Sequence, residues 1–241
     1  MSEEDCTLDG FLGSRLLIAQ PRKGFRAGHD SVLLAAAVPA QAGSHVLELG
    51  AGVGVASLCL GARVPGVEIL GVEIDAGLVR LAEANAARNA MAGRVRFEVR
   101  DAADASGEAV DHVFFNPPFH PGTGEPSPHA ARDRAMREGG DAIAEWTRAA
   151  LALTRQGGTV TAILRADRVP DLLAASGVHS GVVFPLFPRA SEAPKRAIVQ
   201  LTKGGIGPAR TAMGLILHET DGANTQAAEA ILRHGAALVL L

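Results

Sequence analysis

The sequence lacks the features of membrane-spanning, secreted and disulfide-rich proteins. No apolar run among its 241 residues approaches the ~18 consecutive residues that a membrane-spanning helix needs. The start of the chain, Met1 to Asp5, is acidic and lacks the apolar segment of a secretory signal. The two cysteines, Cys6 and Cys59, stand far apart with no pairing pattern. We therefore expect free thiols in a reducing, cytoplasmic environment.

The sequence also lacks metal-ligand spacing and a basic net charge. Its eight histidines are scattered, with no Cys/His pair at ligand spacing, so we expect no metal site. A net charge of −3 argues against indiscriminate nucleic-acid binding. Two stretches, residues 10–29 and 193–218, nevertheless contain no acid and several basic residues. Together they could form a local phosphate-binding face, although ordinary solvated charge explains either stretch alone.

The middle of the chain alternates apolar strand-like runs with helical segments. The predicted strands are 45–49, 67–74, 95–99, 110–115, 159–164, 182–187 and 197–201. The predicted helices are 32–38, 55–60, 76–90, 142–154, 169–175 and 225–233. This βαβ spacing predicts an α/β fold with a doubly wound, mostly parallel seven-stranded sheet and helices on both faces.

An N-terminal extension precedes this alternating region. Leu8 to Gln20 predicts a hairpin, and Asp30 and Ser31 are candidate caps for the apolar helix that Pro39 ends. No composition shift marks a linker between two full domains. We therefore predict an extension over residues 1–40 that packs on a main domain over residues 41–241.

A tetrapeptide, Asn116-Pro117-Pro118-Phe119, follows the buried strand Val113 to Phe115. In open α/β sheets, ligands bind at the carboxyl ends of the strands. Both prolines lack an N–H, so this turn is stiff and cannot hydrogen-bond as a helix start would. The Asn116 side chain and the Pro117 carbonyl would form two acceptors beside the Phe119 ring, which suits a planar substrate with an NH2 group. A proline-rich turn without function is the alternative.

Three alternating glycines, Gly50, Gly52 and Gly54, follow another predicted strand. The pattern does not fit a dinucleotide fingerprint, because the sixth position is Val55 instead of glycine. An acid, Glu48, stands two residues before the loop, where it would repel a pyrophosphate and favour a cation. S-adenosylmethionine has no phosphate and carries a sulfonium and an ammonium group. Glycines would let the backbone approach its amino-acid moiety.

Two further acids end the next two strands. Glu73 lies about twenty residues beyond the glycine loop, where an acid binds the hydroxyl groups of an adenosine ribose. Asp101 follows the third strand, where a carboxylate can accept a hydrogen bond from the adenine amine. Each acid alone is typical of a solvated loop, but three acids at successive strand ends beside a glycine loop indicate a cofactor site.

Together these motifs resemble class I S-adenosylmethionine-dependent amino-methyltransferases. The residues that carry the resemblance are Glu48, Gly50, Gly52, Gly54, Glu73, Asp101 and Asn116-Pro117-Pro118-Phe119. Further segments resemble the bacterial tRNA-valine adenine methyltransferase family, and the resemblance covers nearly the whole chain. These segments are Gly24 to Leu34, Arg134 to Glu138, Arg165 to Arg168 and Pro194 to Arg196. Phe119 departs from the tyrosine common in the group; it keeps a stacking face and loses a hydroxyl.

The resemblance implies a class I methyltransferase (Rossmann-like) fold and methyl transfer from S-adenosylmethionine to an exocyclic amine, of adenine in tRNA. The implied catalytic residues are Asn116, Pro117 and Phe119. The implied cofactor-binding residues are Asp30, Glu48, Gly50, Gly52, Glu73 and Asp101. The basic stretches supply the expected tRNA contacts, namely Arg22, Lys23, Arg26, Lys195 and Arg196.

Other functions remain open from the sequence. A protein-glutamine or an rRNA guanine-amine methyltransferase would use the same acceptor pair, although the basic stretches favour RNA over a protein loop. A nicotinamide oxidoreductase would need the glycine that Val55 replaces. A non-catalytic binding subunit of the same fold is the last alternative, against which the intact acids and Asn116 count.

Overall fold

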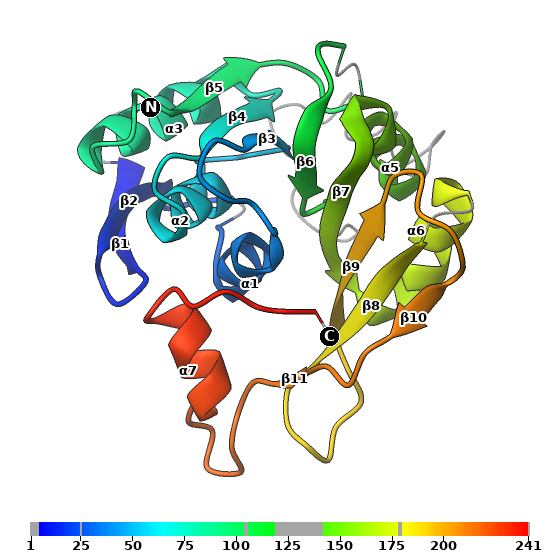
Figure 1. Cartoon of the computed structure of the whole chain (residues 1–241). Helices are drawn as coiled ribbons and strands as arrows, with labels where there is room; N and C mark the ends of the chain where they lie inside the picture. The colour runs from blue at the N-terminus through cyan, green and yellow to red at the C-terminus, as the bar shows by residue number, and fades with distance from the viewer. Residues whose placement is uncertain (1–4, 25, 104–105, 119–141, 178–179, 241) are drawn as a thin grey trace.

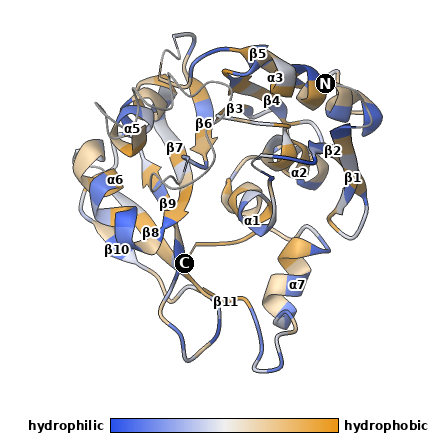
Figure 2. Ribbon diagram, turned by 180° about the vertical axis from the view of Figure 1, so that it is seen from behind, coloured by the Kyte–Doolittle hydropathy of each residue, from blue (hydrophilic) through white to orange (hydrophobic). Residues whose placement is uncertain are grey.

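The central strands are apolar on both sides and form one largely parallel sheet (Figure 1). A computed structural model describes residues 5–24, 26–103, 106–118, 142–177 and 180–240. Along β6, Val113 and Phe115 pack into one core and Phe114 into the other. This two-residue period is what a strand covered on both faces requires. Figure 2 shows hydrophobic segments along β6 and β7 and also on α1, which packs beside the sheet.

The sheet contains nine strands among the described residues. In spatial order they are β10 (Ala209–Thr211), β8 (Ser180–Phe187), β9 (Arg196–Thr202), β7 (Thr154–Arg165), β6 (Val110–Phe115), β3 (His45–Leu49), β4 (Glu68–Glu73) and β5 (Val95–Val99), with β11 (Leu215–Ile216) also pairing with β8. Strand β9 runs antiparallel to β7 and β8, and the other pairings in this sheet are parallel. The order reverses between β3 and β6, which places a topological switch point between them.

Helices cover both faces of the sheet (Figure 1). On one face lie α1 (His29–Ala37), α2 (Val55–Arg63), α3 (Ala76–Arg88) and α7 (Gln226–Leu232). On the other lie α5 (Ala142–Leu153) and α6 (Val169–Ser176), which follows the short 3-10 helix η2 (Ala166–Arg168). The chain therefore has the predicted three-layer α/β architecture, with the carboxyl ends of β5, β4, β3 and β6 along one edge.

A separate antiparallel hairpin precedes the sheet. Strands β1 (Cys6–Phe11) and β2 (Leu16–Pro21) pair with each other, as the sequence predicts. Leu16 and Ile18 of β2 belong to the core that α1, α2 and α3 share. The hairpin is thus packed on the helical layer. The division into an extension over residues 1–40 and a main domain stays a prediction.

The structure corrects three details of the sequence interpretation. Helix α1 begins at His29, and neither Asp30 nor Ser31 caps it, because no side chain bonds its N-terminal amides. Asp30 instead forms an ion pair with Arg196. Strand β7 begins at Thr154, earlier than predicted, and β10 and β11 extend the seven predicted strands at the β8 edge.

Candidate active site

Four parallel strands deliver the candidate residues to one edge of the sheet. In spatial order, Asp101 follows β5, Glu73 ends β4, the glycine loop follows β3 and Asn116 follows β6. These strands lie next to each other and run in the same direction. The motifs read separately from the sequence therefore form one continuous site.

The three glycines of the loop have positive φ angles of 68°, 56° and 85° at Gly50, Gly52 and Gly54. A Cβ on Gly50 would lie 2.4 Å from the ring of Trp146, and one on Gly54 would lie 2.6 Å from the ring of Phe97. Both glycines are therefore needed for packing. A Cβ on Gly52 would meet no atom within 4 Å. Gly52 thus presents its backbone to open space, where a ligand can approach it.

Glu73 holds the glycine loop from the neighbouring strand. One carboxylate oxygen accepts from the Gly52 N–H at 3.0 Å, and the other accepts from the N–H groups of Ile74 at 2.8 Å and Asp75 at 3.0 Å. A carboxylate has about four acceptor positions, so roughly one remains. A diol that donates to both oxygens would share or replace one of these backbone bonds.

Glu48 lies behind the loop and is only 4% exposed. Its Oε2 accepts from the Ser57 N–H at 3.0 Å and from the Ser57 hydroxyl. Burial raises the pKa of this carboxyl to about 8; the Ser57 bonds lower it, and the negative charge of Glu73 raises it further. Glu48 thus joins the end of β3 to the start of α2 and supports the loop. Its predicted contact with the cofactor stays a prediction.

Asp101 is partly exposed after β5, and its Oδ1 accepts from the Ala103 N–H at 3.0 Å. That bond holds the turn after β5. The position fits the predicted contact with an adenine amine at the end of β5.

Asn116 carries an unsatisfied acceptor. Its Oδ1 is buried and has no hydrogen-bond partner among the residues that the structure describes. Most buried polar atoms in proteins are paired, so an unpaired one indicates strain, function or a missing partner. Pro117 is buried and Pro118 exposed, and Phe119 lies outside the described residues. The predicted acceptor pair, Asn116 Oδ1 and the Pro117 carbonyl, therefore lies at the end of β6, and Asn116 Oδ1 has no hydrogen-bond donor among the described residues.

A pocket of about 240 Å³ opens beside Asn116. It is lined by Arg26, Gly28, His29, Asp30, Ser31, Asn116 and Arg196. Asp30 and Arg196, 166 residues apart, form an ion pair of 3.0 Å across its wall. The pocket combines two cationic groups, Arg26 and Arg196, with the Asn116 acceptor.

The predicted basic residues are divided by the structure. Arg26 and Arg196 line the pocket, each paired with an acid, Asp9 or Asp30. Lys195 is exposed and pairs with Glu192 at 3.3 Å. The remaining two, Arg22 and Lys23, lie in the exposed turn after β2. Asp30, assigned to the cofactor, lies in the wall of this pocket.

Other residues of the site received no role from the sequence. Trp146, on α5, packs against Gly50 and forms an edge-on contact with Phe115 at a centroid distance of 6.0 Å. Asn85 is fully buried on α3 and bonds the Val53 carbonyl of the loop. A polar residue at a helical core position is the signal that marks Asn85. For Ser57 and His29 the sequence contains no comparable signal.

Within the described ranges, no three or more His, Cys, Asp or Glu side chains gather where they could hold a metal ion. In the same part of the chain, every helix is too short or too polar to cross a bilayer.

Comparison with known proteins agrees with this geometry. The methyltransferase small domain family matches residues 26–142. A tRNA1(Val) (adenine(37)-N6)-methyltransferase of Porphyromonas gingivalis is 32% identical over 174 residues, 68% of each chain. One of Actinobacillus succinogenes is 27% identical over 199 residues, 81% of this chain and 84% of the relative.

Solved structures share the fold. A protein described as a predicted O-methyltransferase from Agrobacterium tumefaciens has a TM-score of 0.71 at 24% identity, covering 87% of this chain and 98% of its own. The 16S rRNA N2 G1207 methyltransferase of Thermus thermophilus, in complex with S-adenosylmethionine and guanosine, has a TM-score of 0.58 at 21% identity, covering 82% and 50%. The chain is a class I S-adenosylmethionine-dependent N-methyltransferase and belongs to the family of the bacterial tRNA1(Val) (adenine(37)-N6)-methyltransferases.

Proposed function

We propose that this enzyme methylates the exocyclic amine of an adenine in tRNA, with Asn116 as the residue that orients the amine. The buried Oδ1 of Asn116, which has no partner among the described residues and lies beside the pocket with Arg26 and Arg196, is the observation that carries the proposal. An NH2 group is the partner that such an acceptor lacks. The relatives named for adenine 37 of tRNA1(Val) make that nucleotide the first acceptor to test.

The chemistry requires positioning more than a base. The amine lone pair of adenine is delocalised into the ring, so the nitrogen is a poor nucleophile. Asn116 Oδ1 and the Pro117 carbonyl would accept its two N–H bonds and direct the lone pair toward the reacting centre. Positive charge grows on that nitrogen during transfer, and two fixed acceptors stabilise it. The proton becomes acidic only after transfer, so no general base is needed first.

The cofactor site fits S-adenosylmethionine, which when bound supplies an electrophilic methyl group. Glu73 would accept from the ribose hydroxyls and Asp101 from the adenine amine. Gly52, open on its Cβ side, would allow the amino-acid moiety to approach the loop backbone. Phe119, outside the described residues, stays the predicted stacking partner of an adenine turned out of its loop.

Basic residues at the pocket favour an RNA acceptor over a protein loop. Arg26 and Arg196 both reach the pocket, and their guanidinium groups match phosphate geometry. Arg26 and Arg196 now pair with Asp9 and Asp30, and a bound phosphate would either join these ion pairs or replace the carboxylates in them. This also counts against a non-catalytic binding subunit, because the pocket and the amine acceptor occur together.

The test measures methyl transfer from labelled S-adenosylmethionine to a tRNA-Val transcript, to the same transcript with adenine 37 replaced, and to rRNA and release-factor substrates. Mass spectrometry of the nucleosides should show N6-methyladenosine only in the tRNA-Val transcript that contains adenine 37. N2-methylguanosine or methylglutamine as the sole product would overturn the adenine assignment. No product with any acceptor would favour a binding subunit.

Asn116→Ala tests the named residue. The rate should fall on the order of a hundredfold or more, as for loss of one preorganised group in other enzymes. Calorimetric affinity for S-adenosylhomocysteine should stay unchanged. Unfolding free energy should not fall, because the lost oxygen has no partner among the described residues. Asn116→Asp keeps an acceptor and should retain partial activity. An Asn116→Ala variant that melts early yet methylates at the wild-type rate would show that Asn116 only caps the turn.

A further inference from the structure

Asn85 of α3 and Asn89, the residue that follows this helix, bond the backbone of β2 as a neighbouring strand would. Asn85 accepts from the Ala19 N–H at 2.8 Å and donates to the Ala19 carbonyl at 3.0 Å. Asn89, one turn further, accepts from the Leu17 N–H at 3.0 Å and donates to the Leu17 carbonyl at 2.9 Å. Four residues of helix rise about 6 Å and two residues of strand about 6.6 Å, so the two spacings match.

Asn85 and Asn89 differ in the second acceptor of the side-chain amide. Asn89 Nδ2 also donates to the Asn85 carbonyl at 2.8 Å, whereas Asn85 Nδ2 also donates to the Val53 carbonyl at 3.1 Å, inside the glycine loop. Asn85 is fully buried, so both of its amide hydrogens must find acceptors within the protein. Glu73 holds the same loop through the Gly52 N–H. Asn85 thus joins three separate elements: the hairpin, the glycine loop and α3.

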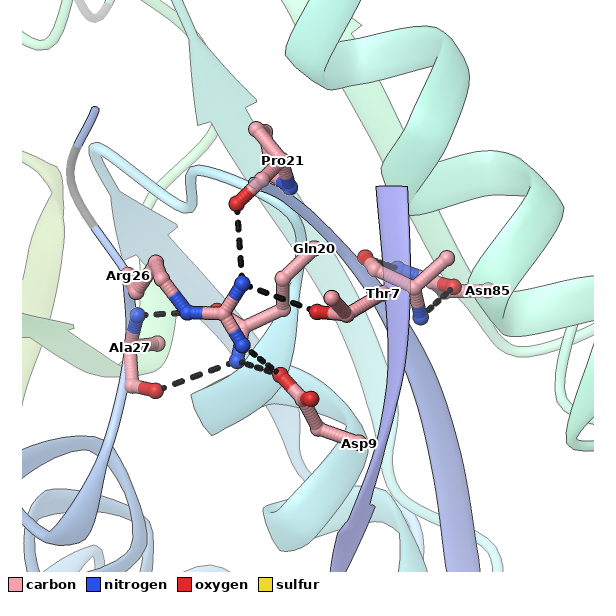
Figure 3. A network of polar contacts seen from close by, with 8 residues as sticks. Thr7, Asp9, Gln20, Pro21, Arg26, Ala27 and Asn85 are labelled. Atoms are coloured by element: carbon pink, nitrogen blue, oxygen red, sulfur yellow. Dashed lines mark hydrogen bonds and ion pairs between the residues drawn. The ribbon is translucent and has the colours of Figure 1, made fainter. Parts of the chain in front are cut away.

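The hairpin continues this network to the pocket. Gln20, the residue after Ala19, is 2% exposed; its Oε1 accepts from the Ala27 N–H at 2.9 Å, and its Nε2 donates to Asp9 at 2.7 Å. Arg26 donates to Thr7 at 2.8 Å and forms an ion pair with the same Asp9 (Figure 3). The segment that follows, with His29 and Asp30, lines the pocket beside Asn116.

We propose that Asn85 is a positioning residue that makes the N-terminal hairpin part of the cofactor site and couples that site to the acceptor pocket. If the loop moves away, the Asn85 amide loses a buried acceptor, and such an unpaired donor is unfavourable. The loop and the hairpin are therefore stable in these positions together. Cofactor binding to the loop then holds the hairpin and, through Gln20, the segment from Arg26 to Asp30. The link to the pocket rests on the proposed function; the link between loop and hairpin does not.

Hydrogen exchange on the wild-type protein tests the coupling without RNA. Saturating S-adenosylhomocysteine, with binding verified by calorimetry, should slow exchange in the glycine-loop peptide and also in β2 over residues 16–21. The control peptide is β8, whose strand pairings are with β9, β10 and β11. Slower exchange in the loop with no change in β2 would overturn the proposal, whatever the acceptor of the enzyme proves to be.

Two matched variants separate the loop bond from the hairpin bonds. Asn85→Ala and Asn89→Ala each remove a pair of bonds to β2, but only Asn85→Ala removes the bond to Val53. Asn85→Ala should weaken S-adenosylhomocysteine binding about tenfold or more, a factor equal to 1.4 kcal/mol. Asn89→Ala should change it less than about twofold, since it leaves the loop bond in place. Equal weakening in both variants would overturn the role of Asn85. If Asn85→Ala fails to fold, the exchange measurement decides alone.

Discussion

Glu48 and Asn85 are polar side chains that the protein buries beneath its cofactor loop. Each lies on a regular element, and each bonds a neighbouring element through backbone or side-chain donors. A buried polar group is stabilising only while its partners stay in place. These residues therefore fix the loop in one geometry, which is a different contribution from that of the apolar core.

The stability of the enzyme should fall with rising pH because of Glu48. Burial raises its pKa from 4.5 to about 8. A raised folded-state pKa gives stability that is fully present below pH 4.5 and is lost as pH rises through about 8. In urea titrations between pH 5 and 8, the unfolding free energy of the wild type should drop by about 1.4 kcal/mol per pH unit relative to Glu48→Gln. Parallel pH profiles for the two proteins would contradict the buried, protonated state.

The strand-end acids and Asn116 could be identified from the sequence, but the sequence does not indicate which of the three acids is buried. Glu48, Glu73 and Asp101 are equivalent in the motif, whereas the structure buries the first and leaves the other two partly exposed. The difference arises from the packing of α2 on β3. It depends on Ser57, nine residues away, and no local pattern indicates that bond.

The glycine loop is the element on which cofactor binding depends, and its glycines have unequal roles. Gly50 touches Trp146 across the loop, while Gly52 faces open space. The sequence presents the three glycines as one repeating pattern. Their different neighbours come from α5 and β5, which are distant in the chain.

Alanine substitutions should separate these roles. Both positions have positive φ, so each substitution costs about 1 kcal/mol in backbone strain. Gly50→Ala also forces a Cβ within 2.4 Å of Trp146 and should lower the melting temperature strongly. Gly52→Ala should lower the melting temperature by only a few degrees, because the backbone strain is its main cost. It should nevertheless lose much of its affinity for S-adenosylhomocysteine. Calorimetry and thermal melts measure both; unchanged affinity in a folded Gly52→Ala would remove Gly52 from the cofactor site.

Most elements could be predicted because their apolar periodicity is strong. Strands β5 and β6 match their predicted bounds, and α3 begins at Ala76 as predicted. The misses have physical causes. Strands β10 and β11 have three and two residues, too few for a period to show. Helix α1 begins without a side-chain cap, because Gly28 occupies the cap position, and Asp30 inside the first turn pairs with Arg196 from β9.

Although the net charge of the molecule is −3, its basic residues are unevenly distributed. The acid-free stretches around Arg26 and Arg196 are far apart in the sequence, yet the fold brings these two residues to one pocket. The sequence showed the charges but not their pairing with Asp9 and Asp30, because ion pairs between distant segments leave no local pattern. The proposed RNA substrate would therefore compete with existing carboxylates for these arginines.

Binding of tRNA should consequently weaken as salt rises. The log–log slope should be roughly −0.7 for each single-stranded phosphate neutralised. Arg196→Gln should reduce the magnitude of that slope by about the contribution of one phosphate. Lys203→Gln is the matched control, because Lys203 follows the other end of β9, away from the pocket. Affinity independent of salt, or equal slopes for the two variants, would reject the phosphate contacts.

The side-chain bonds along β2 also bear on self-association. An unpaired strand edge can recruit a strand of another molecule and start aggregation. On β2, the outward groups of Leu17 and Ala19 are occupied by two asparagines, and Pro21 has no N–H while its carbonyl accepts from Arg26 at 3.0 Å. The bonds that hold the hairpin to the cofactor loop thus also close this edge to a foreign strand.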